Sequence, residues 1–174
     1  LISAFFTLLL IGFAGCSYVE SFEVTKLLAE KGYAYAQYNL GIIYDNGFGV
    51  PENDAEAAKW YRLAAEQGDV DAQFNLGLMY DSGNGVPQND VEAVKWLRLA
   101  AEQGQVNAQL RLGGMYELGK AVPENDVEAV KWFRLAAEQG DAIGQFSLGF
   151  MYASGNGVPE NNAEAVKWYR LAAE

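Results

Sequence analysis

The tryptophans and the prolines of this chain recur at one fixed interval. Each member of either set lies 36 residues from the next one. The tryptophans are Trp60, Trp96, Trp132 and Trp168, and the prolines are Pro51, Pro87, Pro123 and Pro159. Self-similarity at a period of roughly 20 to 50 residues is typical of arrays built from one supersecondary unit. Because one such unit cannot bury both of its faces, we expect neighbouring copies to stack into a continuous core.

The second half of each copy has the pattern of an amphipathic helix. In the first copy the apolar face carries Ala57, Trp60, Tyr61, Ala64 and Ala65. These positions repeat at three- and four-residue spacings, which predicts a helix buried on that side. On the charged side, Arg62 and Glu66 are placed to pair as i,i+4 neighbours.

The start and the end of this helix are both marked in the sequence. Each copy has an asparagine followed three residues later by a glutamate, which is the spacing of a capping box. The pairs are Asn53 with Glu56, Asn89 with Glu92, Asn125 with Glu128, and Asn161 with Glu164. Gly68, Gly104 and Gly140 then stand where a left-handed residue closes a helix.

The first half of each copy is a second helical pattern, "AQYNLGIIY" in the first copy. Ala36, Leu40 and Tyr44 share one face of it. Gly41 lies mid-helix, where glycine costs about 1 kcal/mol relative to alanine, so we expect a close approach there, with the tryptophan of the partner helix filling the space. A Gly-x-Gly-Val-Pro loop joins the two helices. The third copy reads Gly-Lys-Ala instead, which predicts another loop conformation, beginning at Gly119.

These features together resemble the Sel-one-like repeat, a 36-residue relative of the tetratricopeptide repeat. The resemblance rests on the alanine–leucine–glycine–tyrosine spacing, the Gly-x-Gly-Val-Pro loop and the Trp-x-x-x-Ala-Ala run that ends at glycine. It implies an all-α fold, an α-α superhelix (solenoid) of about four helix-turn-helix repeats with the first helices on its concave side. The repeats are expected at 33–68, 69–104, 105–140 and 141–174, the last truncated, after a linker and degenerate capping helix at 16–32.

The first fifteen residues differ from the rest because they carry no charge. They are too short to span a membrane but match the apolar core of a secretory signal peptide, here 1–15. Phe13-Ala14-Gly15-Cys16 resembles the lipobox of bacterial lipoproteins, which implies lipidation of Cys16 and an anchor on the periplasmic face of the outer membrane. The alternative is an uncleaved or buried apolar segment with an incidental cysteine. Since the chain opens at Leu1, we expect a piece of a longer reading frame.

Composition excludes several classes of function. The chain has no histidine, one cysteine and a formal net charge of −11. Histidine is the commonest general base and metal ligand, and a strongly acidic protein repels nucleic acid. The repeated glutamates have a capping role, and the segment from Asp45 lacks the ligand pattern of a calcium loop. Each lysine before a tryptophan is expected to be solvated rather than part of a cation–π site. We therefore expect no catalytic residues, no metal and no cofactor.

One feature exceeds what stacking requires, since the outward face of the first helices is also apolar. Its residues are Tyr35, Tyr38, Ile42, Asp71, Phe74, Leu78, Leu110, Phe146 and Phe150, with Asp45, Asp81 and Glu117 as an acidic rim. A helix that is apolar all round is either buried or binds a partner. The strip therefore predicts either contact between neighbouring first helices or a groove for a protein or peptide, with the rim favouring basic partners.

The function expected from this pattern is a non-catalytic protein–protein interaction scaffold of the bacterial cell envelope. Two alternatives stay open. Cysteine-rich members of the same repeat family are described as penicillin-binding or β-lactamase-like, which would make the chain an envelope hydrolase, but this chain has no cysteine in any repeat. The other alternative is a purely structural spacer whose open ends stack.

Overall fold

The computed structural model describes residues 16–174, with side chains from Phe22 onward, and this part of the chain is entirely helical apart from its loops. The helices are α1 (Cys16–Glu30), α2 (Ala34–Asn46), α3 (Asp54–Glu66), α4 (Val70–Ser82), α5 (Asp90–Glu102), α6 (Val106–Leu118), α7 (Asp126–Glu138), α8 (Ala142–Ser154) and α9 (Asn162–Ala172). None of them has the length and hydropathy needed to cross a membrane. The predicted signal peptide, 1–15, and the side chain of Cys16 lie outside what the structure describes.

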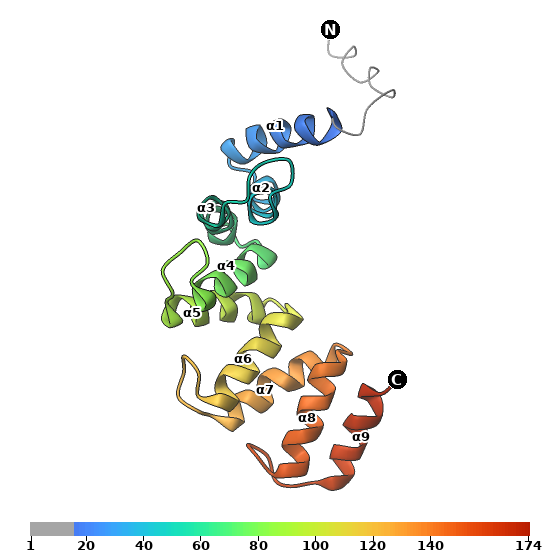
Figure 1. Cartoon of the computed structure of the whole chain (residues 1–174). Helices are drawn as coiled ribbons and strands as arrows, with labels where there is room; N and C mark the ends of the chain where they lie inside the picture. The colour runs from blue at the N-terminus through green and yellow to red at the C-terminus, as the bar shows by residue number, and fades with distance from the viewer. Residues whose placement is uncertain (1–15) are drawn as a thin grey trace.

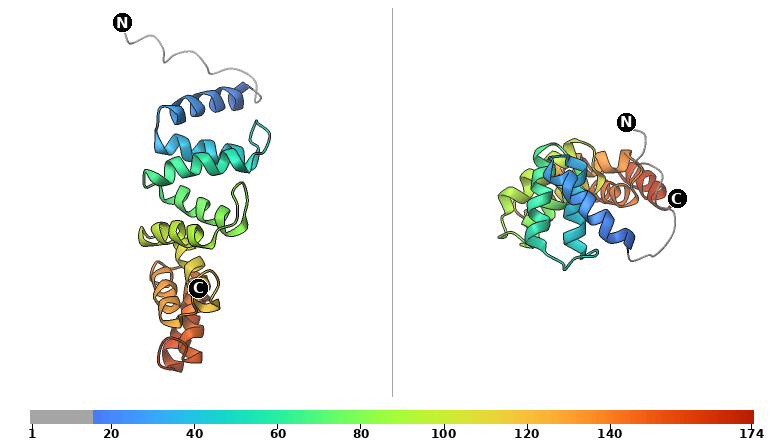
Figure 2. Two further views of the ribbon diagram at one scale, coloured as in Figure 1. Left: turned by 90° about the vertical axis from the view of Figure 1, so that its left-hand side faces the viewer. Right: turned by 90° about the horizontal axis from the view of Figure 1, so that it is seen from above.

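Each helix packs against its neighbours in sequence, so the chain forms a curved column of stacked helices (Figure 1 and Figure 2). The first helices of the repeats are α2, α4, α6 and α8, and the second helices are α3, α5, α7 and α9. Helix α1 covers the open side of the first pair, where Ala29 is buried with Leu40 and Trp60. The predicted all-α solenoid is confirmed.

Of the predicted capping box, the asparagine part is formed and the glutamate part is not. The side chain of Asn53 accepts from the backbone N–H of Glu56 at 3.1 Å, and the other three asparagines cap in the same way. The glutamate does not reach back to the asparagine, as a full capping box requires. Instead the backbone N–H of Asn53 donates to the carbonyl of Tyr44 at 2.8 Å, since the loop folds back onto the preceding helix. Gly68 takes a φ of +92°, as predicted for a helix end.

The mid-helix glycines do allow a close approach, but the residue they contact is not the tryptophan. A Cβ on Gly41 would lie 2.5 Å from the ring of Tyr61, and one on Gly113 would lie 2.5 Å from the ring of Phe133. The prediction was therefore wrong by one residue. The side chain after the tryptophan points into its own repeat, whereas Trp60 packs in one cluster with Ala29 of α1.

A ladder of buried glutamines joins the repeats, and the sequence analysis missed it. Gln73 donates to the carbonyl of Ala65 at 3.1 Å and accepts from Gln103 at 2.8 Å. The same two bonds recur one repeat earlier and one repeat later. Because buried polar groups need partners, the glutamine is bonded at both its amide nitrogen and its amide oxygen. Its bond to Ala65 ties the second repeat to the first, while the bond from Gln103 joins the two ends of the second repeat. The signal was available, since these glutamines recur every 36 residues like the tryptophans.

Arginine of the second helix also acts between repeats. Arg62 donates to the hydroxyl of Tyr80 in the next repeat at 2.5 Å, and Arg98 and Arg134 do the same one and two repeats later. The predicted pairing of Arg62 with Glu66 is not formed.

The loops contact the preceding repeat, and the third loop keeps the common conformation. A Cβ on Gly85 would lie 2.1 Å from the carbonyl oxygen of Asp54, so glycine lets this loop lie close against the preceding repeat. Ala121 occupies the equivalent position of the third loop and has a φ of +66°, close to the +65° of Gly85. The predicted change of conformation was wrong, because Ala121 keeps the left-handed backbone of the other loops although this costs a residue with a Cβ about 1–2 kcal/mol.

Candidate functional site

The predicted partner-binding residues lie on the first helices, whose outward surface we call the first-helix face. Its exposed members among them are Tyr35, Asp71, Phe146 and Phe150. Its half-buried members are Tyr38, Ile42, Asp45, Phe74, Leu78, Leu110 and Glu117, and Asp81 is buried. The strip residues therefore all lie on first helices, but they range from buried to exposed.

The half-buried apolar residues of the strip contact the next repeat. Tyr38 and Ile42 pack against the core of the second repeat, and Phe74 and Leu78 against that of the third. Tyr38 lies 5.9 Å from Tyr61 between ring centroids. Burial and the charges of Asp71 and Asp69 raise the pKa of the Tyr38 hydroxyl. These residues serve the stacking of repeats while one edge stays open to solvent.

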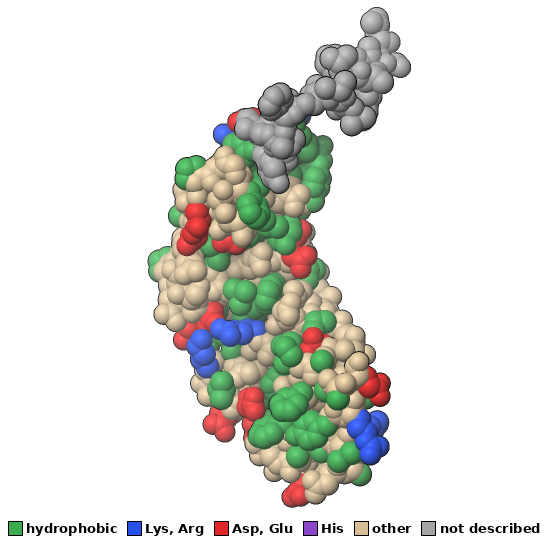
Figure 3. Space-filling model, turned by 45° about the vertical axis from the view of Figure 1, so that its right-hand side comes forward, with side chains coloured by type: hydrophobic (Ala, Val, Ile, Leu, Met, Phe, Trp, Pro, Cys, Tyr) green, Lys and Arg blue, Asp and Glu red, His purple; other side chains and the backbone are tan. Residues whose placement is uncertain are grey.

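Besides Tyr35 on α2, the exposed apolar side chains of the strip lie on α8, where Ile143 is their neighbour. The exposed fractions are 64% for Ile143, 58% for Phe146 and 45% for Phe150. Phe146 lies 5.4 Å from Tyr169, so the two rings extend one apolar surface onto α9. Figure 3 shows hydrophobic side chains gathered over the lower, C-terminal part of the molecule, with charged side chains around them. An exposed apolar group of this kind is typical of a protein-binding surface.

The acidic rim is not uniform, because Asp81 is already neutralised. Its side chain is 4% exposed and is paired with Arg111 and with Lys120, whose Nζ lies 2.8 Å away. Burial alone would raise the pKa of Asp81, but the hydrogen bonds and charges of Lys120 and Arg111 outweigh it and lower the pKa. Asp81 is therefore a structural residue and not part of a free rim. Both cations are departures of the third copy from the repeat, which was the missed signal.

The two other rim carboxylates meet no cation in the described structure. Asp45 accepts a hydrogen bond from the hydroxyl of Tyr61 at 3.1 Å. Burial, followed by the charge and hydrogen bond of Asp45, raises the pKa of Tyr61 well above its ordinary value, which keeps this hydroxyl protonated. Burial and the nearby charge of Asp126 raise the pKa of Glu117. These groups keep a negative potential on the first-helix face.

Each lysine that precedes a tryptophan is exposed to solvent, as expected, but it also folds over the indole, which was not expected. Lys95 Nζ lies 4.8 Å from the ring centroid of Trp96 and 3.0 Å from a carboxylate oxygen of Glu92. The other copies show the same arrangement at 5.2–5.7 Å. Adjacent side chains diverge at the backbone, but the long lysine stem curves back over the ring. The ring face is thus occupied by the chain's own cation.

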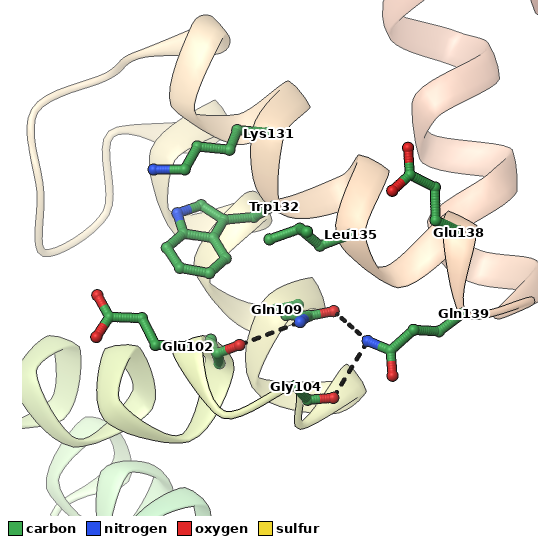
Figure 4. A pocket seen from close by; sticks show the side chains of 9 residues that line it. Glu102, Gly104, Gln109, Lys131, Trp132, Leu135, Glu138 and Gln139 are labelled. Atoms are coloured by element: carbon green, nitrogen blue, oxygen red, sulfur yellow. Dashed lines mark hydrogen bonds between the residues drawn. The ribbon is translucent and has the colours of Figure 1, made fainter.

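A pocket of about 510 Å³ lies at the seam between the second and third repeats, next to Trp132 (Figure 4). Gln139 borders it and donates to Gln109 at 2.9 Å and to the carbonyl of Gly104 at 3.1 Å. The one lysine of the lining, Lys131, is paired with Glu128 and lies over the ring of Trp132, and the lining contains no serine, threonine, cysteine or histidine. Nor do the described residues contain a cluster of acidic, histidine or cysteine side chains that could hold a metal ion. The pocket is a feature of repeat stacking.

Comparison with known proteins decides the family. The Sel1 repeat matches residues 34–69, 70–105, 106–141 and 142–174. The chain belongs to the Sel1 repeat family. Sel1 repeat proteins are in general non-catalytic scaffolds that mediate protein–protein interactions.

Solved structures with the same fold include proteins of several bacteria. The chain is 45% identical to c5321, a protective antigen of uropathogenic Escherichia coli with an SLR fold, at a TM-score of 0.84; the match covers 87% of this chain and 32% of that one. It is 38% identical to a Sel1 repeat protein from Oxalobacter formigenes, at a TM-score of 0.82 over 91% of this chain and 68% of that one.

A more distant likeness is to cysteine rich protein B of Helicobacter pylori, which is 28% identical at a TM-score of 0.53, with 68% of this chain and 84% of that one covered. The chain thus spans about a third of the length of the Escherichia coli antigen. No match was found among curated proteins.

Proposed function

We propose that this Sel1 array is an adaptor that binds one partner protein on its concave, first-helix face. The single observation that carries the proposal is that the apolar strip of the first helices stays open to solvent at Tyr35 on α2 and at Phe146 on α8, which are 56% and 58% exposed. Between these two positions, Tyr38 and Phe74 are half-buried against the following repeat. Burying two aromatic side chains in a complex contributes a few kcal/mol at about 25 cal/mol per Å², which suits a central contact of an interface.

The charge of the array supports a basic partner. The net charge is −11, and Asp45, Asp71 and Glu117 lie on or beside the first-helix face. An acidic field of this kind accelerates encounter with a cationic protein and repels anionic ones, including nucleic acid.

The proposed location is the periplasmic face of the outer membrane, with lipid at Cys16 as the anchor. The support is the lipobox-like run that ends at this lone cysteine. In the full-length protein, Cys16→Ser is expected to move the array from the membrane fraction to the soluble periplasm. An unchanged distribution would contradict the anchor.

The binding surface is tested by site-specific crosslinking. A benzophenone side chain in place of Ile143 is expected to capture a discrete basic protein in envelope extract, and Phe146→Ala with Phe150→Ala is expected to abolish the capture. The matched control is Val91→Ala with Val127→Ala, since these valines are 76% and 64% exposed on second helices. Capture that survives the phenylalanine changes, or is lost equally in the control, would contradict the assignment.

A further inference from the structure

The junctions between successive repeats share one geometric plan. A carboxylate at the end of one first helix faces two positions of the next repeat, one in its first helix and one in its loop. At the second junction these are Asp81, Arg111 and Lys120, and both cations are bound to the carboxylate. This junction is closed by the chain itself.

The first junction has the same plan but no cation. Asp45 stands 36 residues before Asp81, and Asn75 and Asn84 stand 36 residues before Arg111 and Lys120. The three residues line one pocket of about 150 Å³. Among the described residues, the Asp45 carboxylate accepts its hydrogen bond from the neutral Tyr61 hydroxyl and is paired with no cation. The position equivalent to Tyr61 at the second junction is Leu97, so there the cations stand in for the hydroxyl.

We propose that the pocket at Asp45 binds the guanidinium group of an arginine from a basic segment of the partner. This inference rests on the proposed function, since it names the chemistry of the same face's partner. The second junction shows that the geometry accepts an arginine and a lysine nitrogen at the carboxylate. The first junction offers the same carboxylate to a cation from outside the chain.

The lining of the pocket favours arginine over other cations. A guanidinium has five N–H donors in a planar fork, so it can bind a carboxylate and still donate to further oxygens. The amide oxygens of Asn75 and Asn84 are such acceptors. Leu78 and Met79 also line the pocket and provide an apolar wall for the arginine stem. Lysine has three donors on a point charge and would satisfy fewer of these groups.

In sequence, the third junction also has a carboxylate but no basic residue at the two positions that face it. Glu117 stands 36 residues after Asp81, and Ser147 and Asn156 take the positions of Arg111 and Lys120. A segment with two basic side chains would therefore contact the array on both sides of the self-neutralised middle junction.

The proposal is tested with the tripeptide N-acetyl-Leu-Arg-Leu-amide and its citrulline counterpart, which keeps the shape of arginine without the charge. Binding is followed by NMR at the backbone amides of Asp45 and Met79. Both residues line the pocket, and their backbone N–H groups are kept in every variant. The arginine peptide is expected to bind at least tenfold more tightly than the citrulline peptide. Asp45→Asn is expected to reduce the arginine peptide to the affinity of the citrulline one.

A second variant gives the first junction the two cations of the second junction. Asn75→Arg with Asn84→Lys is expected to abolish binding and to raise the melting temperature, because the chain then supplies both cations. Equal affinity of the two peptides, or undiminished binding by Asp45→Asn, would overturn the proposal. If the peptides fail these tests but the crosslinking that depends on Phe146 is kept, only the arginine pocket is contradicted. If the peptides bind as expected but the selective crosslinking is lost, only the proposed function is contradicted.

Discussion

At the scale of single residues, packing decides which glycines of the first helices are replaceable. Gly113 and Gly114 are neighbours on α6, and both lie in helical backbone. A Cβ on Gly113 would lie 2.5 Å from Phe133, whereas one on Gly114 would meet nothing within 4 Å. Phe133 is only 4% exposed, so its ring has little room to move. Alanine at either position gains the same helix propensity, but only at position 113 does its Cβ meet a closely packed neighbour.

Alanine substitutions at these two glycines are expected to have opposite effects. Gly114→Ala should stabilise the fold by up to about 1 kcal/mol, since alanine is the better helix former. Gly113→Ala should destabilise it by about 1 kcal/mol or more, because overpacking costs roughly 1–3 kcal/mol and exceeds the gain in propensity. Urea unfolding followed by circular dichroism measures both. Equal stabilisation by the two changes would show that the contact with Phe133 is not tight.

Features that are set within one helix could be predicted from the sequence. Contacts that depend on how two helices are oriented could not. The asparagine caps and the buried face of Ala57 and Trp60 follow from spacing within one helix. The contact of Gly41 with Tyr61 depends on how two helices cross, which spacing does not fix. The same holds for Arg62, which bonds to Tyr80 in the next repeat and not to Glu66 one turn away.

At the scale of elements, one charged network connects α4 to α6 and to the loop that follows it. Asp81 lies in the last turn of α4, Arg111 lies on α6 and Lys120 lies in the loop. The loop keeps its conformation with Ala121 at positive φ, so Lys120 stays beside the carboxylate. Removing the buried carboxylate leaves two cations without their shared partner.

The stabilising effect of Asp81 is expected to depend on pH. Its folded pKa is lowered, so its contribution is present above the ordinary aspartate pKa of about 3.9 and is lost as the pH falls through the folded value. Asp81→Asn should therefore melt below the wild type at neutral pH, and the two melting temperatures should converge in acid. A constant difference from neutral pH to pH 3 would contradict the network.

Glu117 provides the control with the opposite sign. Its folded pKa is raised by burial and by Asp126, so ionised Glu117 disfavours the folded state at neutral pH. Glu117→Gln should melt slightly above the wild type at neutral pH. The difference should vanish as the pH falls below the ordinary glutamate value of about 4.3.

At the scale of the whole molecule, the sequence specified the architecture and left the binding surface open. A 36-residue period with capped helices leads to a stacked array, because only stacking covers both faces of each pair. The apolar strip was visible in sequence, but its exposure was not, since Phe74 and Phe146 occupy equivalent positions with different surroundings. The pocket at Asp45 could not be predicted from the sequence. Only the contacts of Asp81 in the structure show which two positions face the carboxylate at each junction.

The central claim is that the repeats share one core and stabilise each other through their junctions. Deleting residues 70–105 joins Asp69 to Val106 in register and removes α4 and α5. Urea unfolding of this shorter array is expected to show one cooperative transition at a lower midpoint with a smaller m-value, since less surface is exposed on unfolding and one junction is lost. An unchanged midpoint and m-value would contradict a shared core.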